Sequence, residues 1–163
     1  MGCSINTLVE KTGVNRFSLY HEFENKEGIL YASLKLYKER YCNRKFDILK
    51  EEGDIQKVLK KFYLSFLQND DIIPGCYFIH IGTELADSDE KIKGILEEYL
   101  LEMEELFVDI LNRNEYPNEE SVTISKHLVG LFCTSTSFCL IHSESQRDQY
   151  IENGINVIFG TNG

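Results

Sequence analysis

The chain has 163 residues, of which 42% are hydrophobic and 12% aromatic, and its formal net charge is −10 at pH 7. These values are typical of a folded protein of one or two small domains and exclude an intrinsically disordered chain. No apolar run approaches the roughly 20 residues of a transmembrane helix, and the N-terminus lacks the pattern of a signal peptide. We therefore expect a cytoplasmic protein.

Positive charge is concentrated in the first part of the chain. Residues 1–50 contain nine Lys and Arg against six Asp and Glu, whereas the remaining residues contain eight against 21. Phosphate groups repel an acidic segment, so any contact with nucleic acid must come from the N-terminal part.

The N-terminal part has the pattern of two short helices joined by a tight turn. Ile5, Leu8 and Val9 are spaced i, i+3 and i+4, which gives the first helix one apolar stripe. Gly13 stands where a helix end favours a left-handed residue without a Cβ, and Asn15 suits the N-cap of the second helix. Such a pair is a helix-turn-helix, whose second helix enters the major groove of DNA.

The segment from Val14 to Glu27, VNRFSLYHEFENKE, resembles the signature of TetR/AcrR-type transcriptional regulators. In that family a Gly-Val turn precedes a short recognition helix ending in a Leu-Tyr pair, here Leu19-Tyr20. A Phe follows, here Phe23, and an Asn-Lys-Glu step at residues 25–27 then begins a long fourth helix. The combined spacing is more specific than a generic helix-turn-helix pattern.

By position in this motif, the resemblance implies the DNA-facing residues Asn15, Arg16, Phe17, Ser18, Tyr20, His21 and Lys26. Arg16 is long enough to contact a phosphate or to bind guanine in bidentate fashion. Tyr20 and Lys26 match positions at which the family contacts the DNA backbone, and such contacts position a protein without specifying sequence. Family members often have a small residue in place of Phe17. The phenyl group would either contact a thymine methyl group or hinder close docking.

The family's DNA-binding domain includes a further helix upstream, which packs across these two and completes a three-helix domain. The present sequence starts at Met1, almost directly on the second of the three helices. We expect a form without the first helix to leave Ile5, Leu8 and Phe23 without a packing partner. Two functions stay open at this point: a DNA-binding regulator, or a truncated regulator body that no longer binds DNA and acts as a small-molecule sensor or dimerisation module.

Helical patterns continue along the chain, and we expect an all-α fold. The predicted elements up to residue 75 are, in order, a helix from about Lys26 to about Lys50, a polar break at 51–54, an amphipathic helix at 55–68, a helix end at Asn69-Asp70-Asp71 and a turn at Pro74-Gly75. Residues 76–86 are rich in β-branched and aromatic residues, so a buried strand is an alternative there. We predict a helix, because Gly75-Cys76 followed by an apolar run also resembles a subset of TetR-type regulators.

Three further helices are predicted in the C-terminal half. Asp87 and Glu90 are spaced as a capping box, and a long helix should extend from there to about Asn112. After a loop with Pro117, a helix should continue to about Ser143, and a last one should include residues 145–159. The helix before Ser143 is apolar nearly all round, so more than one of its faces must be buried. In the family the final two helices pair with their copies in a second subunit, so the resemblance implies a homodimer.

The resemblance implies a helix-turn-helix DNA-binding region at residues 1–46 and a helical-bundle ligand-binding and dimerisation domain at residues 47–163. A small apolar or aromatic effector would bind in the bundle and release the protein, acting as a repressor, from its operator. The candidate ligand-binding residues are Phe62, Tyr63, Phe66, Tyr77, His80, Tyr99, Met103, Phe107, Phe132, Thr136 and Cys139. The alternative for each is a plain core position, since aromatic stripes at helical spacing usually form cores.

The residues that could support enzymatic chemistry form no recognisable site. There is no glycine-rich phosphate loop, no zinc-type His pair and no nucleophile elbow. Cys76 and His80 could meet on one helix face, but no third group is identified to orient them. The five cysteines form no Cys-x-x-Cys pair, so we expect reduced, mostly buried thiols. We therefore expect no enzyme activity, no cofactor and no metal site.

Overall fold

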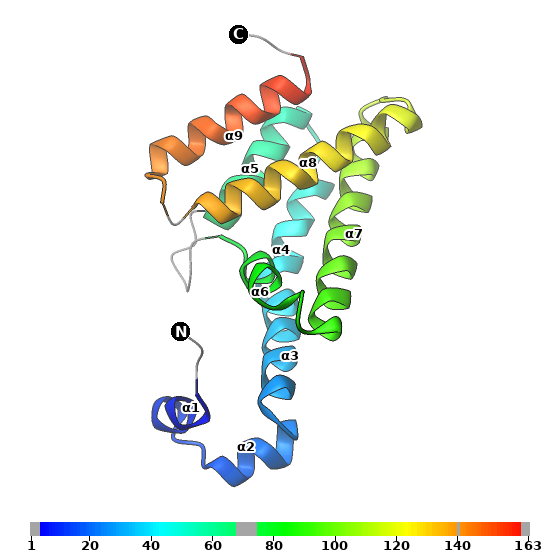
Figure 1. The fold of residues 1–163 in the computed structure, drawn as a ribbon. Helices are drawn as coiled ribbons and strands as arrows, with labels where there is room; N and C mark the ends of the chain where they lie inside the picture. Colours follow the sequence, from blue (N-terminus) through cyan, green and yellow to red (C-terminus); the bar gives the residue numbers. More distant parts are fainter. Residues whose placement is uncertain (1–3, 68–74, 140, 161–163) are drawn as a thin grey trace. The chain divides into compact units, whose positions relative to one another are not determined.

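The computed structural model describes residues 4–67, 75–139 and 141–160. Every regular element among these residues is helical (Figure 1), which confirms the predicted all-α fold. The chain divides into two compact units, residues 1–40 and residues 41–163. The boundary predicted from the sequence, after residue 46, lies among the short helical segments at the start of the second unit.

The first unit contains α1 (Ile5–Thr12), α2 (Arg16–Phe23) and α3 (Lys26–Tyr37). α2 contacts both α1 and α3. α1 begins at an N-cap serine, Ser4, whose hydroxyl accepts a hydrogen bond from the Thr7 N–H. It ends at Gly13, whose φ of +70° is the left-handed conformation predicted from the sequence. The two-helix pattern is therefore confirmed.

The junction between α2 and α3 requires a glycine. The Asn25 side chain caps α3 by accepting a hydrogen bond from the Gly28 N–H at 2.7 Å. This cap holds the first turn of α3 close to the end of α2. A Cβ atom on Gly28 would collide with the carbonyl oxygen of Phe23, which belongs to the backbone and cannot move aside as a side chain can.

We expect Gly28→Ala to lower the free energy of unfolding by about 1–3 kcal/mol, the range for forcing extra atoms into a packed site. Gly94→Ala is the matched control, because Gly94 lies within a helix and a Cβ added there meets no atom within 4 Å. The free energy of unfolding of that variant should rise by about 0.5–1 kcal/mol, because alanine has a higher helix propensity than glycine. Urea unfolding followed by circular dichroism measures both changes, and equal shifts in the two variants would contradict the close approach at Gly28.

The predicted helix from Lys26 to Lys50 is confirmed, but it is not uniform. α3 is followed by a π-helical turn, η1 (Lys38–Cys42), then by α4 (Asn43–Phe46) and a 3₁₀ turn, η2 (Asp47–Lys50). The Arg113 guanidinium donates hydrogen bonds to the carbonyl oxygens of Leu49 and Lys50. Those carbonyls have no partner within the helix, so Arg113 caps its C-terminal end.

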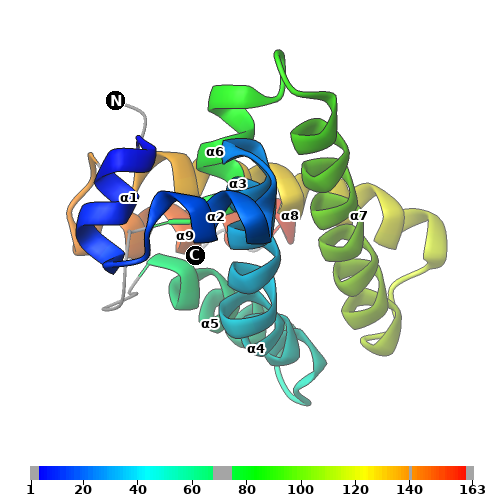
Figure 2. The same ribbon diagram turned by 90° about the horizontal axis from the view of Figure 1, so that it is seen from below.

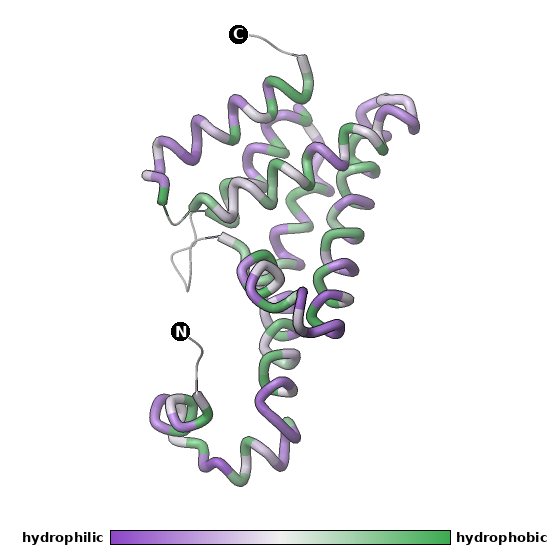
Figure 3. The backbone as a smooth tube through the Cα atoms, in the orientation of Figure 1, coloured by the Kyte–Doolittle hydropathy of each residue, from purple (hydrophilic) through white to green (hydrophobic). Residues whose placement is uncertain are grey.

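The second unit is a helical bundle that also contains α5 (Ile55–Leu67), α6 (Tyr77–Leu85), α7 (Glu90–Arg113), α8 (Asn118–Phe138) and α9 (Glu144–Ile158). α8 contacts α5, α6, α7 and α9 and is the central helix of this unit (Figures 1 and 2). Apolar and polar residues alternate along α7, so that one face is apolar and another carries its glutamates (Figure 3).

The core of the second unit is a cluster of aromatic rings centred on Phe62. The Phe62 side chain is fully buried. Its ring centroid lies within 6.3 Å of five other ring centroids, those of Phe46, Tyr63, Phe66, Phe107 and Phe132. These rings come from α4, α5, α7 and α8, so the cluster joins most of the bundle.

The predicted start of α7 and the predicted end of α8 were wrong. In both cases another residue forms the helix cap. α7 is capped by Asp89, which accepts hydrogen bonds from the N–H groups of the second and third residues that follow it, and not by Asp87. α8 ends at Phe138 instead of near Ser143, because Ser143 forms a capping box with Gln146 and begins α9.

The ambiguous segment at 76–86 is helical, as α6, and the strand alternative was wrong. The predicted helix end at residues 69–71 and the turn residue Pro74 lie outside the described residues.

Candidate nucleic-acid interface and effector region

The position of α2 is determined by a cap at its start and one apolar residue in its middle. The Asn15 side chain accepts a hydrogen bond from the Ser18 N–H at 2.8 Å, as the sequence predicted. Leu19 is buried and Phe23 is half-buried, so these two residues form the inward side of α2. The first turn of α2 contains no acidic residue. Its positive dipole end is therefore available to an anion such as a phosphate.

All seven predicted DNA-facing residues are exposed: Asn15, Arg16, Phe17, Ser18, Tyr20, His21 and Lys26. Arg16, Phe17, Tyr20 and His21 are spaced i, i+1, i+4 and i+5 and therefore share one face of α2. Neighbouring side chains support each other there: the Arg16 guanidinium lies 6.0 Å from the Tyr20 ring centroid. The structure thus brings six of the seven residues together on or beside α2, and Lys26 begins α3.

The charge of the first unit is nearly balanced. Residues 1–40 contain six Lys and Arg and five Asp and Glu, so the excess of positive charge seen over residues 1–50 comes largely from residues after the unit boundary. A diffuse electrostatic attraction to phosphates is consequently weak in this unit. Binding to DNA would depend on the particular side chains exposed on α2.

The predicted ligand-binding residues lie together in the second unit, where most belong to its core. Eight are buried: Phe62, Tyr63, Phe66, Tyr99, Met103, Phe107, Phe132 and Thr136. Tyr77 and His80 are half-buried on α6, and Cys139 is buried just after α8. The aromatic members of the buried set pack ring against ring, so in this structure they fill the space that a ligand would occupy.

Polar groups within this core are satisfied by specific partners. The Tyr63 hydroxyl donates a hydrogen bond to the Leu128 carbonyl oxygen at 2.7 Å, and burial raises the pKa of Tyr63 well above its ordinary value. The Cys76 sulfur lies 3.4 Å from the Tyr99 hydroxyl, and burial raises the pKa of the Cys76 thiol. A raised pKa keeps this thiol protonated, which is the opposite of an activated nucleophile.

Two features of this region were not predicted from the sequence. The Lys45 ammonium is buried and lies 4.3 Å from the Phe66 ring centroid, a cation–π contact. Gly75 has a φ of +102°, and a Cβ there would approach the Cys139 sulfur to 2.6 Å. This close approach and the positive φ require glycine at position 75, which gives a physical reason for the Gly75-Cys76 sequence. Nothing in the sequence distinguishes Lys45 from the exposed lysines.

A mostly apolar groove of about 240 Å³ lies where α6, α7 and α8 meet. Its lining residues are Ile79, Thr83, Leu96, Leu100, Cys133, Thr134, Ser137 and Phe138. None of them is among the predicted ligand-binding residues, because the sequence pattern emphasised aromatic side chains and only one lining residue, Phe138, is aromatic. Burial raises the pKa of Cys133, the half-buried thiol of the groove.

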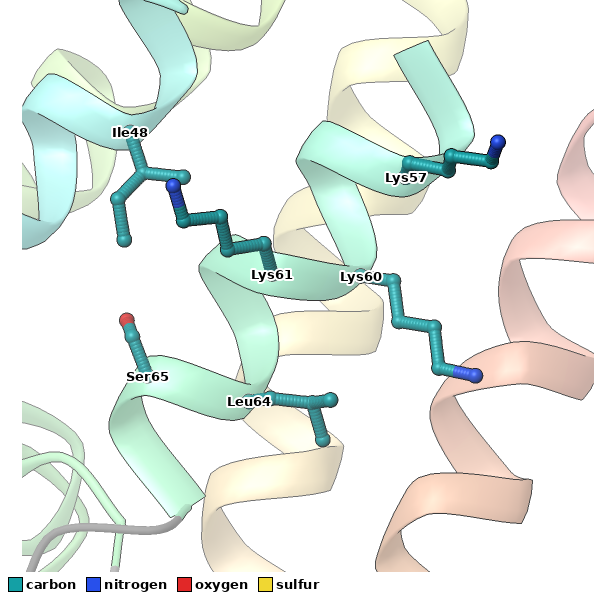
Figure 4. Close-up of a pocket in the computed structure, with 6 residues that line it drawn as sticks. All are labelled: Ile48, Lys57, Lys60, Lys61, Leu64 and Ser65. Atoms are coloured by element: carbon teal, nitrogen blue, oxygen red, sulfur yellow. The ribbon is translucent and has the colours of Figure 1, made fainter. Parts of the chain in front are cut away.

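A second hollow, of about 480 Å³, is lined by three lysines of α5 together with Ile48, Leu64 and Ser65 (Figure 4). Lys60 forms an ion pair with Glu152 at 2.8 Å, and Lys61 forms one with Glu51 at 2.7 Å. Intramolecular carboxylates therefore already neutralise two of its three cations. We interpret this hollow as part of a solvated, charged surface.

The described residues contain no disulfide bond between two of their cysteines, no metal cluster and no membrane-spanning helix. Cys42, Cys76, Cys133 and Cys139 form no disulfide bond with one another, and three of them are buried, as predicted; Cys3 lies outside the described residues. No three His, Cys, Asp or Glu side chains gather there as a metal site would require. None of the helices is both long and apolar enough to cross a lipid bilayer.

The chain is similar to known proteins both in sequence and in structure. No family model matches the chain. Among curated proteins, the HTH-type transcriptional repressor ComR of Escherichia coli strain K12 is 30% identical over 97 residues, which are 57% of this chain and 46% of the repressor. The matched segment thus spans about half the length of that relative.

Three solved structures share the fold over nearly all of the chain. A TetR-family regulator from Cytophaga hutchinsonii has a TM-score of 0.83 at 20% identity, with 98% of this chain and 84% of that chain covered. A cysteine mutant of the TetR-family regulator CifR, in a structure with 26-base-pair operator DNA, has a TM-score of 0.80 at 16% identity, with coverage of 95% and 86%. The reduced form of E. coli NemR has a TM-score of 0.72 at 18% identity, with coverage of 98% and 86%.

The chain has the TetR-family fold. The resemblance that the segment from Val14 to Glu27 suggested is therefore confirmed by structural neighbours that cover both units. In this TetR-family fold, α1 and α2 form the helix-turn-helix, and α5 to α9 belong to the helical bundle. ComR is a transcriptional repressor, and CifR and the Cytophaga hutchinsonii protein are transcriptional regulators.

Proposed function

We propose that the chain is a DNA-binding transcriptional regulator of the TetR type that acts in the cytoplasm as a repressor. The observation that carries this proposal is the exposed face of α2. This helix is capped by Asn15, and Leu19 is its one buried residue. A short helix that exposes most of its surface contributes little to a core, so its exposed side chains are available to a partner. The duplex major groove accommodates a helix of this kind.

In the proposed complex, α2 enters the major groove with its N-terminal residues toward the base edges. Arg16 contacts a guanine or a phosphate, and Ser18 approaches the DNA near the positive end of the helix dipole. Tyr20 and Lys26 contact the phosphate backbone and position the helix. The near balance of charge in the first unit supports this division of roles, because individual contacts must then supply most of the affinity.

Enrichment of duplexes from a random-sequence library tests this proposal. The full chain is incubated with the library at low salt, bound duplexes are recovered over several rounds, and the pool is sequenced. The proposal predicts one enriched sequence motif. Recovery of a pool without any motif would contradict sequence-specific DNA binding.

We also propose that the chain forms a homodimer through α8 and α9. These helices and the turn between them expose the large apolar side chains Val122, Phe138, Ile141 and Val157. A two-fold dimer would present two copies of α2 to successive major grooves, which agrees with the usual half-site geometry of helix-turn-helix proteins.

Val157→Glu should weaken dimerisation by about tenfold or more, because it would introduce an unpaired charge into the proposed interface. Val157 is 76% exposed in the single chain, so the folded subunit itself should be unaffected. Leu101→Glu is the matched control, since Leu101 is 57% exposed on α7, away from the proposed interface helices. Sedimentation equilibrium measures the dimer dissociation constant of the natural chain and of the two variants. A dimer that is equally stable in all three proteins would contradict this interface.

The proposed effector is a small apolar or aromatic molecule that binds among the aromatic side chains of the second unit. Because these rings fill the space in the present structure, binding would select a more open arrangement of the bundle. The change would shift the helix that begins at Lys26 and separate the two α2 helices from successive grooves. Linkage requires reciprocity: a compound that raises the melting temperature of the free protein must bind more weakly to the DNA complex if it is the releasing effector.

The alternative function is that of a small-molecule sensor or dimerisation module without DNA binding. The small core of the first unit favours it, since only Ile5, Leu19 and Leu34 are buried among the described residues of that unit. The enrichment experiment separates the two functions, because the alternative predicts a stable dimer and no enriched motif.

A further inference from the structure

Phe17 has an exposure that folding does not explain. Its side chain is 79% exposed, and no other large apolar side chain in the described part of the chain is as exposed. It is the second residue of α2. Its sequence neighbours Arg16 and Ser18 are also exposed, so the phenyl group lies within the polar face that is proposed to meet DNA.

The ring of Phe17 has a neighbour on the helix surface. Its centroid lies 6.1 Å from that of His21, one turn later, with an angle of 31° between the two planes. Side chains at i and i+4 lie one above the other along a helix. The contact therefore holds the phenyl ring beside His21 and limits the space it sweeps, which favours contact with DNA over hindrance of docking.

The major groove offers very few apolar groups to such a ring. Each base pair presents hydrogen-bond donors and acceptors there, which a phenyl group cannot satisfy, and thymine adds a C5-methyl group. A phenyl ring placed over any other base edge would desolvate polar atoms without replacing their hydrogen bonds. The favourable target of Phe17 is consequently the methyl group of a thymine.

We propose that Phe17 contacts the C5-methyl group of a thymine in the DNA site and determines the preference for a T·A pair at that position. This assignment rests on the proposed DNA-binding function and adds a specificity-determining residue to it. His21 acts as a positioning residue for the ring. The polar residues on either side of Phe17 supply contacts that do not depend on the methyl group.

The test uses the duplex motif enriched by the full chain, with each thymine replaced in turn by deoxyuridine, which lacks only the methyl group. Fluorescence anisotropy at one fixed salt concentration measures Kd for the natural chain, for Phe17→Ala and for Phe17→Leu. Leu36→Ala is the control for loss of an exposed apolar side chain, since Leu36 is 46% exposed on α3 of the same unit. Circular dichroism checks that all variants keep the same helical content.

At one thymine, deoxyuridine should weaken binding by the natural chain about fourfold, the factor for burying one methyl-sized group. Leu36→Ala and Phe17→Leu should retain most of this sensitivity, and Phe17→Ala should lose it.

An enriched motif with no such thymine, or one whose deoxyuridine sensitivity is unchanged in Phe17→Ala, would overturn the assignment while the proposed function stands. Failure to enrich any motif would overturn both.

Discussion

Replacing Phe62 with alanine should lower the free energy of unfolding by about 3–5 kcal/mol, the range for removing a fully buried aromatic side chain. The ring is fully buried and contacts five other rings from four helices. Its neighbours are themselves held by packing and cannot collapse fully into the space, so the loss includes both the transfer term and a cavity term. Urea unfolding followed by circular dichroism measures the change.

Phe17→Ala is the matched control for this prediction, because it makes the same chemical change at a site that is 79% exposed. Its effect should stay within about 0.5 kcal/mol, as is usual for surface substitutions. A Phe62→Ala variant that loses less than about 1 kcal/mol would contradict the packed core described here. Such a result would instead favour a preformed cavity around this ring.

Arg16→Ala should weaken binding to the enriched duplex by about tenfold to hundredfold, the range for losing a specific arginine contact to DNA. Arg16 is exposed, and its guanidinium lies 6.0 Å from the centroid of the Tyr20 ring. Protein stability should therefore stay nearly unchanged while DNA affinity falls. Arg16→Lys should restore part of the affinity if the contact is to phosphate and little of it if the contact is bidentate to guanine.

Lys35→Ala is the control for loss of one positive charge, since Lys35 is exposed on α3 and outside the predicted DNA-facing set. Its effect on affinity should be small and should disappear as salt is raised. Anisotropy titrations of the three variants and the natural chain measure the differences. If Arg16→Ala and Lys35→Ala weaken binding equally, α2 has no special role and the assignment of the DNA-facing residues is wrong.

The elements that local sequence determines were predicted well. Gly13 and Asn15 specify a helix end and a helix start within three residues, and both caps are present as predicted. The α7 and α8 boundaries were less predictable because several capping residues compete within a few positions. Asp89 and Ser143 form better caps than the alternatives, and only their hydrogen bonds in the folded chain show which prevails.

Properties that depend on packing between distant residues could not be predicted. Helical periodicity indicates that Phe62, Tyr99 and Phe107 face inward, but it does not show whether rings fill the interior or surround a cavity. The cap that Arg113 provides to residues 49 and 50 joins positions more than 60 apart and leaves no local pattern. The exposure of Phe17 is likewise a tertiary property, since the same phenyl group on another face of α2 would be buried.

The most direct test of DNA binding is a titration of the full chain with its enriched duplex over a series of salt concentrations. A regulator that places α2 in the major groove should bind tightly at about 50 mM salt, and log Kd should rise linearly with log salt concentration by about 0.9 for each phosphate contacted. Its affinity for a duplex of scrambled sequence should be much lower at every salt concentration. Absence of binding at low salt, or equal affinity for both duplexes, would contradict the account.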